Sequence, residues 1–164
     1  MKSVHFLGNP SSPHVRHWEM LLNANGVTPV VHGIGRHLGH QVLVQSARAL
    51  GPAWSKRLPA PMAYVLAGLW LRRQRRTGGT SAPAFFHAHN TSGYGLTAWL
   101  SGVPYGVTTY GTEIFGASRR SPLYRHLIKK VLNSAAFITS ASPQMTRTLT
   151  SELLVDPEKI HEFY

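Results

Sequence analysis

Two short blocks, each running from an apolar stretch into polar residues, hold most of the side chains that could bind a ligand. The first block runs from Phe85 to Asn90 and the second from Thr108 to Ile114. In an open parallel sheet, ligands bind outside the carboxyl ends of the strands. We therefore expect one cleft to be lined by the polar residues that end the two blocks, which are His89, Asn90, Tyr110, Gly111, Thr112 and Glu113.

The elements that must position these residues alternate between strand and helix. Apolar runs predict strands at 3–8, 27–34, 83–89, 105–110, 136–140 and 159–164, and a short strand or helix at 41–50. Helical patterns cover 14–24, 62–76, 95–101, 122–133 and 143–154, with Ser11-Ser12-Pro13 as a start signal and Asn25-Gly26 as a stop signal. This alternation predicts an α/β fold with a Rossmann-like parallel sheet and helices on both faces.

The composition bounds the architecture and the chemistry. With 164 residues and 43% apolar residues, the chain is long enough for one core, so we expect residues 1–164 to form a single domain. It has no cysteine, which excludes disulfides, thiolate metal ligands and thiol nucleophiles. The first ten residues contain no apolar run of the length of a secretory signal, so we expect a cytoplasmic location.

The net charge of +11 is unevenly distributed. Four of the six acidic residues lie from Glu152 onward, whereas 16 of the 17 Lys and Arg residues lie before it. Such a surface attracts phosphate, whether in nucleic acid, in a nucleotide or in an anionic membrane.

Three residues near the strand ends each have two interpretations. Glu113, which follows a glycine, could orient hydroxyl groups of a ligand, or it could cap backbone amides or pair with Arg119 or Arg120. His87 and His89 alternate along a strand and so share a face, which permits metal ligation, but no third ligand is evident. We therefore expect no metal, a buried structural histidine at 87 and a cleft-lining histidine at 89.

The start of the first predicted helix is a second candidate part of the cleft. His14 and Arg16 lie on its first turn, where free backbone amides and positive side chains would meet an anionic group. The alternative is that both are ordinary surface residues.

The predicted helix from Met62 is apolar for ten residues and then strongly basic. It is too short to span a bilayer, which needs about 20 apolar residues. It is either a core helix with a solvated basic end or a helix at an anionic membrane surface. The basic residues of the membrane alternative are Arg72, Arg73, Arg75 and Arg76, with Lys129 and Lys130 as a second basic face.

In their order and spacing, these segments resemble the amino-terminal half of glycosyltransferase family four, whose GT-B fold contains two facing Rossmann-like domains. The segments that carry the resemblance are Ser12 to Trp18, His87 to Asn90, Gly102 to Tyr105, Tyr110 to Glu113 and Asn133 to Ser142. Together they cover most of the chain.

The resemblance implies transfer of a sugar from a nucleotide-sugar donor to a glycan or lipid-linked acceptor, with retained anomeric configuration and no required metal or other cofactor. It implies a hexosyltransferase-like enzyme of polysaccharide or glycolipid biosynthesis. The two basic faces favour a peripheral position of the chain on the inner face of the membrane, which would suit a lipid-linked acceptor. The resemblance also implies that this domain holds the acceptor, while the donor-binding carboxyl-terminal domain is absent. We therefore expect little transfer activity from the isolated chain.

Two departures from the family pattern bear on the cleft. Many relatives have a glycine pair in the loop after the first strand, where this chain has Gly8-Asn9-Pro10, and many have histidine where this chain has Tyr110. A tyrosine donates a hydrogen bond well but is a poor base at neutral pH. The competing function is a noncatalytic basic module that binds RNA or an anionic membrane. RNA is disfavoured because the chain lacks a recognised aromatic stacking motif.

Overall fold

A computed structural model describes residues 3–34, 47–52, 57–77, 83–117 and 121–163. Seven strands form one parallel sheet in the order β3-β2-β1-β4-β5-β6-β7. The strands are β1 (Ser3–Leu7), β2 (Thr28–Ile34), β3 (Ala47–Leu50), β4 (Phe86–His89), β5 (Tyr105–Thr108), β6 (Phe137–Ser140) and β7 (Ile160–Glu162). The Rossmann-like parallel sheet predicted from the sequence is confirmed.

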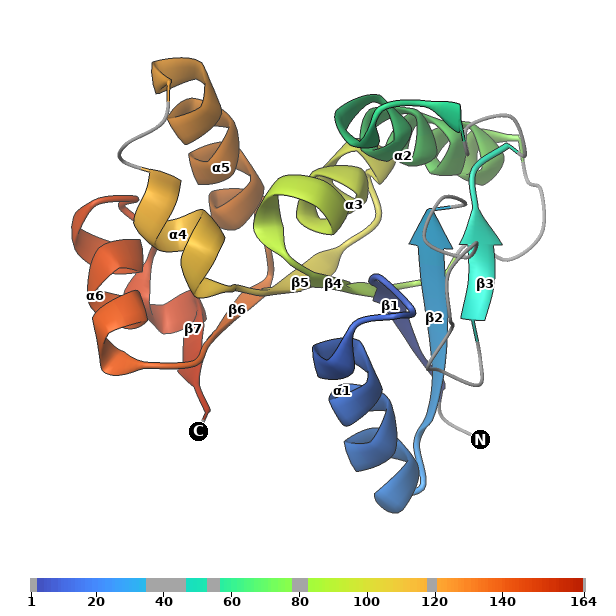
Figure 1. The fold of residues 1–164 in the computed structure, drawn as a ribbon, viewed down its shortest axis with the longest axis horizontal. Helices are drawn as coiled ribbons and strands as arrows, with labels where there is room; N and C mark the ends of the chain where they lie inside the picture. The colour runs from blue at the N-terminus through green and yellow to red at the C-terminus, as the bar shows by residue number, and fades with distance from the viewer. Residues whose placement is uncertain (1–2, 35–46, 53–56, 78–82, 118–120, 164) are drawn as a thin grey trace.

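Helices lie on both sides of the sheet (Figure 1). One side carries α1 (Pro13–Ala24), and the opposite side carries α2 (Ala60–Arg76), α3 (Leu96–Ser101) and α5 (Pro122–Ser134). The remaining elements are α4 (Gly111–Ala117), α6 (Pro143–Ser151), the π-helical turn η3 (Thr91–Gly95) and the 3₁₀ turn η4 (Pro157–Lys159). This arrangement places the carboxyl ends of β1, β4 and β5 along one edge, where the site lies.

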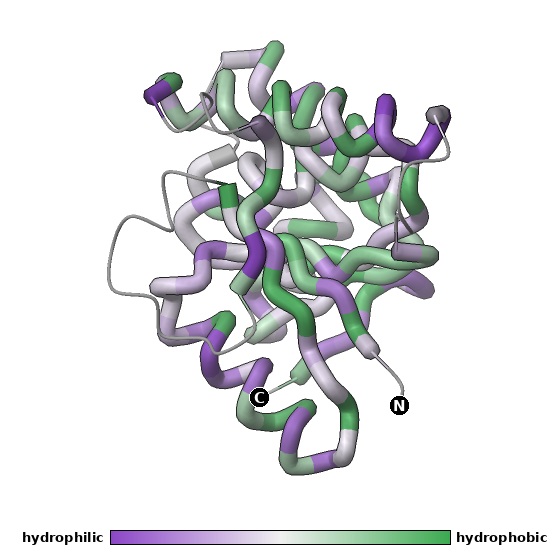
Figure 2. Tube along the Cα trace, turned by 90° about the vertical axis from the view of Figure 1, so that its right-hand side faces the viewer, coloured by the Kyte–Doolittle hydropathy of each residue, from purple (hydrophilic) through white to green (hydrophobic). Residues whose placement is uncertain are grey.

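The central strands are buried on both faces, which explains their continuous apolar character. Every residue of β4 and β5 is buried, and Phe86 pairs in register with Tyr105. Figure 2 shows hydrophobic segments gathered in the sheet at the centre of the molecule. The main core, which includes Leu7, Val107 and Ile138, fills the side that faces α2, α3 and α5. A smaller core of Phe6, Val15 and Val31 lies under α1.

Three helices begin with serine followed by proline. The hydroxyl oxygens of Ser121 and Ser142 accept hydrogen bonds from backbone amides of the first turns of α5 and α6. Ser12 occupies the same position before α1, but its side chain makes no capping hydrogen bond. At the other end of α1, Gly26 has a φ of +70°, which confirms the predicted left-handed stop.

The aromatic ring of Phe137 lies directly over Gly106 on the neighbouring strand. A Cβ atom at Gly106 would lie 2.3 Å from the Cζ atom of that ring. We therefore expect Gly106→Ala to lower the free energy of unfolding by about 2 kcal/mol, because the ring must move in a packed region. Urea unfolding measures this change. Gly116→Ala is the matched control, because a Cβ there meets no atom within 4 Å. An equal loss in both variants would contradict the contact.

The structure differs from the sequence prediction mainly beside the site. The predicted strand at 83–89 is shorter, since β4 starts at Phe86, and the strand at 105–110 ends at Thr108. Residues 111–117, for which the sequence analysis predicted no element, form α4. Of the predicted segment at 41–50, residues 47–50 form β3 and the rest lie outside the described residues.

Candidate functional site

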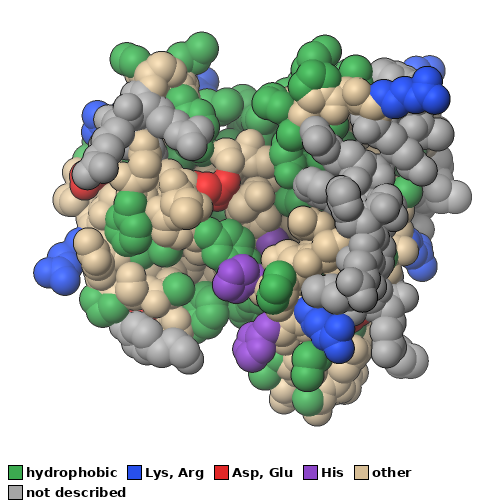
Figure 3. Space-filling view, viewed as in Figure 1, with side chains coloured by type: hydrophobic (Ala, Val, Ile, Leu, Met, Phe, Trp, Pro, Cys, Tyr) green, Lys and Arg blue, Asp and Glu red, His purple; other side chains and the backbone are tan. Residues whose placement is uncertain are grey.

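A cleft of about 700 Å³ lies at the carboxyl edge of the central strands. Figure 3 shows this face hollowed at its centre, with an acidic group inside and histidines at its margin. The cleft is lined by Asn9, Ser12, His14, Val15, Tyr64, His89, Asn90, Tyr94, Tyr110, Gly111, Thr112 and Glu113. The lining combines aromatic rings with hydroxyl, amide, imidazole and carboxylate groups, so it suits a ligand that has both apolar faces and many hydroxyls.

The turn that follows β4 is built around Asn90. This residue has a φ of +93° and a ψ of 154°, a backbone conformation that is otherwise adopted almost only by glycine. Its side-chain oxygen accepts hydrogen bonds from the amides of Gly93 at 3.1 Å and Tyr94 at 2.8 Å. The side-chain oxygen of Asn90, which was predicted to line the cleft, therefore holds η3 against the strand end.

Glu113 ties the second strand end to the first. Its carboxylate accepts hydrogen bonds from the Thr91 amide at 2.7 Å, the Ser92 amide at 3.2 Å and the Ser92 hydroxyl. The side chain therefore fits the capping interpretation, with its amide partners on η3 rather than on its own helix. Its other predicted partners, Arg119 and Arg120, lie outside the described residues.

His89, Tyr110 and His14 form a connected row across the cleft. The Nδ1 atom of His89 lies 3.1 Å from the Tyr110 hydroxyl, and the His14 ring packs against the Tyr110 ring at 5.0 Å between centroids. Burial, followed by the charges of His87 and His14, lowers the pKa of His89 well below its usual value. Burial, followed by the charge of Glu113, raises the pKa of Tyr110. At neutral pH, His89 is therefore uncharged and Tyr110 remains a phenol.

His87 lies behind this row in an aromatic cluster. Its ring contacts those of Phe6, Trp18 and His89 at centroid distances of 5.4, 5.3 and 4.9 Å. Its Nε2 atom lies 2.8 Å from the Thr108 hydroxyl. Burial lowers the pKa of His87 to about 4. This geometry agrees with a structural role for His87.

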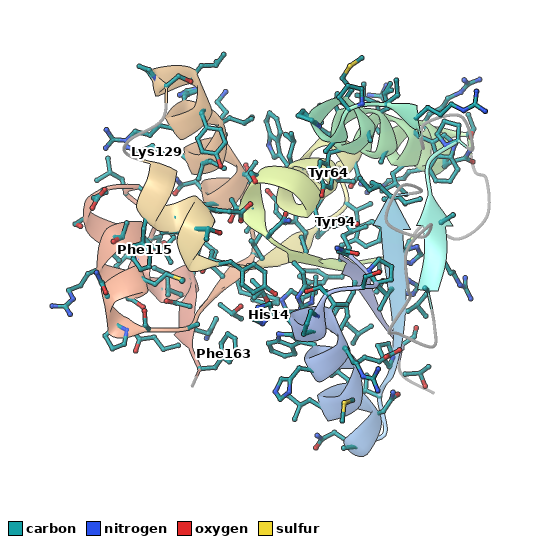
Figure 4. All side chains as sticks on the ribbon, in the orientation of Figure 1. His14, Tyr64, Tyr94, Phe115, Lys129 and Phe163 are labelled. Atoms are coloured by element: carbon teal, nitrogen blue, oxygen red, sulfur yellow. The ribbon has the colours of Figure 1, made fainter. Side chains whose placement is uncertain are left out.

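Two tyrosines that the sequence analysis did not single out cover the opposite wall. The rings of Tyr64 and Tyr94 meet edge to face at 5.1 Å, and Figure 4 shows them across the cleft from His14. Gly93 lies under the Tyr64 ring, where a Cβ atom would approach to 2.6 Å. The hydroxyl of Tyr94 accepts a hydrogen bond from the amide of Ile34. The segment Gly93-Tyr94-Gly95, which follows β4, is the feature of the sequence that could have indicated an aromatic wall here.

The loop after β1 forms the floor of the cleft beside α1. The side-chain oxygen of Asn9 accepts a hydrogen bond from the Ser11 amide at 3.0 Å, which closes a tight turn. Gly8 allows α1 to approach the sheet, since a Cβ there would lie 2.9 Å from Val15. Asn9 thus lies in the loop for which the sequence analysis noted a departure from the glycine pair of the family that the chain resembles.

The structure brings seven of the eight predicted cleft residues together. They are His14, His89, Asn90, Tyr110, Gly111, Thr112 and Glu113. Arg16 is exposed on α1 and does not line the cleft. It lies two residues after His14, so the helical turn directs it away from the strand ends.

The described part of the chain contains neither a metal-binding cluster nor a membrane-spanning helix. Within these residues, no group of three or more His, Cys, Asp or Glu side chains could hold a metal ion. Across the same ranges, no helix has the length and apolar character needed to cross a bilayer.

Comparisons with known proteins agree with the fold. The family model of the glycosyl transferase 4-like domain matches residues 11–163. The chain is similar to sucrose-phosphate synthase from Thermosynechococcus elongatus, with a TM-score of 0.64 and 13% identity over 99% of this chain and 47% of that chain. A second structure of that organism's sucrose-phosphate synthase gives a TM-score of 0.60 and 12% identity over 98% of this chain and 87% of that chain. No curated protein matches the sequence.

Proposed function

This chain belongs to the family of glycosyl transferase 4-like domains, and we propose that it forms the acceptor-side half of a retaining, hexosyltransferase-like glycosyltransferase. The enzyme transfers a sugar from a nucleotide-sugar donor to a glycan or lipid-linked acceptor in the cytoplasm. The observation that carries this proposal is the cleft at the strand ends, which combines the rings of His14, Tyr64 and Tyr110 with hydrogen-bonding groups. Sugars present apolar ring faces and hydroxyls that both donate and accept, and this lining complements both features.

In this proposal, the donor and the acceptor bind to different halves of the enzyme. The chain spans about half the length of the first sucrose-phosphate synthase structure, 47% of it. We assign the nucleotide part of the donor to a second Rossmann-like half that faces this cleft. Transfer then requires both halves of the enzyme, because the donor and the acceptor must be held with their reacting atoms within about 3.5 Å of each other. The isolated chain is expected to have little or no transfer activity.

Tyr110 is proposed to position an acceptor hydroxyl. Its phenol is held by the imidazole of His89 at 3.1 Å, and burial keeps it protonated at neutral pH. A protonated phenol can donate to a sugar oxygen, but it cannot serve as the base that removes a proton. We therefore assign Tyr110 to positioning and name no catalytic residue on this chain.

The experiment that tests the proposal measures transfer from a panel of nucleotide sugars by the protein that the gene encodes, with Tyr110→Phe as the variant. The substitution removes one hydrogen bond to the acceptor and keeps the ring against His14. We expect kcat/KM to fall about tenfold, with the greater part of the change in the acceptor KM. The KM for the nucleotide sugar is expected to stay unchanged.

Tyr124→Phe on α5 is the matched control, because Tyr124 does not line the cleft. It is expected to retain the parent rate. Equal rates in the Tyr110→Phe variant and the parent would contradict the positioning role. Salt-dependent retention on RNA, with no transfer from any donor, would instead favour a noncatalytic basic module.

A further inference from the structure

We propose that the outward face of α2 docks on an anionic membrane surface and so presents a lipid-linked acceptor to the cleft. The biological use of this docking rests on the proposed function, whereas the docking itself is a property of the helix. We use the name docking face for Met62, Val65, Leu66, Leu69, Arg72, Arg73 and Arg76.

The docking face changes from apolar to basic along a single line of the helix. Met62, Leu69, Arg73 and Arg76 follow one another at intervals of seven, four and three residues, so they lie on one side. Met62 is 52% exposed and Leu69 is 45% exposed. Figure 3 shows hydrophobic surface over α2 and Lys or Arg side chains at its end. An apolar stripe next to a cationic end matches the acyl and headgroup layers of a bilayer surface.

The opposite face of α2 fixes this orientation. Ala63, Ala67, Gly68 and Leu71 are buried. Gly68 packs so closely on α3 that a Cβ atom there would lie 2.8 Å from the carbonyl oxygen of Thr97. Because the small residues set a close contact with α3, the helix cannot rotate to bury Met62 and Leu69. The packing of α2 on α3 therefore keeps Met62 and Leu69 exposed.

The positive charge on the last turn of α2 favours an anionic binding partner. Arg72, Arg75 and Arg76 surround a hollow of about 340 Å³, in which Arg75 donates a hydrogen bond to the Gly102 carbonyl. The sequence contains no acidic residue between Glu19 and Glu113, so neither α2 nor α3 carries one to neutralise these arginines. Each basic residue adds favourable free energy near acidic lipid. RNA fits less well, because four of the seven docking-face residues are apolar and non-aromatic, and they offer no group that would bind phosphate or stack on a base.

The docking face adjoins the mouth of the cleft. Tyr64, on the second turn of α2, lines the cleft, and Pro61, Met62, Val65 and Leu66 line an apolar hollow of about 330 Å³ on the same part of the helix. A membrane on α2 would therefore bring lipid headgroups close to Tyr64. The acceptor class that this arrangement favours is an amphiphile whose polar head accepts the sugar.

Helix α5 lies on the same side of the sheet as α2, with α3 between them (Figure 1). Leu123 at its start is 78% exposed, and Lys130 is exposed farther along the helix. Lys129 is half-buried, and Figure 4 shows it at some distance from α2. The contribution of Lys129 and Lys130 is therefore secondary to that of the docking face.

The test is cosedimentation of the chain with vesicles of phosphatidylcholine, alone or mixed with phosphatidylglycerol. We expect binding to the mixed vesicles and little binding to phosphatidylcholine alone. Arg73→Gln with Arg76→Gln should weaken binding to the mixed vesicles about thirtyfold, since two cationic contacts are lost. Met62→Gln with Leu69→Gln should weaken it about tenfold, since two inserted side chains are lost.

Matched controls come from elements away from α2. Met20 and Leu21 on α1 are 60% and 48% exposed, so Met20→Gln with Leu21→Gln repeats the apolar change on the other side of the sheet. Arg48→Gln with Arg147→Gln repeats the charge change at two other exposed positions. Both controls should bind as the parent does, and thermal unfolding checks that all variants fold.

Three results would overturn the docking proposal: no binding to the mixed vesicles, equal weakening in the α1 and α2 variants, or retention on RNA in place of vesicles. The assay contains neither donor nor acceptor. A failure here would therefore leave the transfer measurement to decide the proposed function, and a failure of transfer would leave vesicle binding intact.

Discussion

Replacing Glu113 by alanine is expected to lower the free energy of unfolding by about 3 kcal/mol. The Glu113 carboxylate accepts two amide hydrogen bonds and one hydroxyl hydrogen bond from Thr91 and Ser92. Removing it leaves these donors unsatisfied beside the buried Thr91, and each unsatisfied buried donor costs about 1–3 kcal/mol. Urea unfolding monitored by circular dichroism measures the change.

Two further variants sharpen this experiment. Glu113→Gln keeps one carbonyl acceptor, so its loss is expected to be about half as large. Glu152→Ala removes an exposed carboxylate at the end of α6, and its effect is expected to stay within about 0.5 kcal/mol. If Glu113→Ala were as stable as Glu152→Ala, the carboxylate would not be holding the two strand ends together.

Lowering the pH from 7 to 5 is expected to destabilise the domain strongly. Burial lowers the pKa of His87 to about 4, whereas an unfolded histidine has a pKa near 6.5. The unfolded chain therefore takes up the proton first, and stability falls as the pH drops from about 6.5 to 4. His87 alone contributes a loss of about 2 kcal/mol at pH 5.

Other buried histidines act in the same direction. Burial, followed by the charges of His5 and Arg48, lowers the pKa of His32 to about 4, and the pKa of His89 is also lowered. The measurement is the free energy of unfolding from urea titrations at several pH values. In His87→Gln the loss between pH 7 and pH 5 should shrink by about 2 kcal/mol. A parent chain with equal stability at both pH values would refute the prediction.

The fold was predictable because its signals are local. Apolar runs marked the strands, and the pairs Ser12-Pro13, Ser121-Pro122 and Ser142-Pro143 lie where helices begin. No helix was predicted at 111–117, because the glycines and the threonine of this segment have low helix propensity. Its helical form depends on packing against α5 and α6, which no local pattern reports.

The site was predictable where chain topology alone determines position. Residues that end or closely follow β4 and β5 had to meet at one edge, and His89, Tyr110 and Glu113 do line one cleft there. The contribution of Tyr64 was not predictable, because it depends on how α2 crosses η3 over Gly93. Likewise, the amides that Glu113 caps lie more than twenty residues away in sequence, so its partners emerged only from the fold.

The most direct test of an acceptor-side role is an NMR titration of the isotope-labelled chain with glycans, lipid-linked sugars and nucleotide sugars. We expect amide shifts at His14, His89, Tyr110 and Thr112 with a glycan or lipid-linked sugar, and none there with nucleotide sugars alone. Shifts with nucleotide sugars and none with any acceptor of the panel would contradict the account.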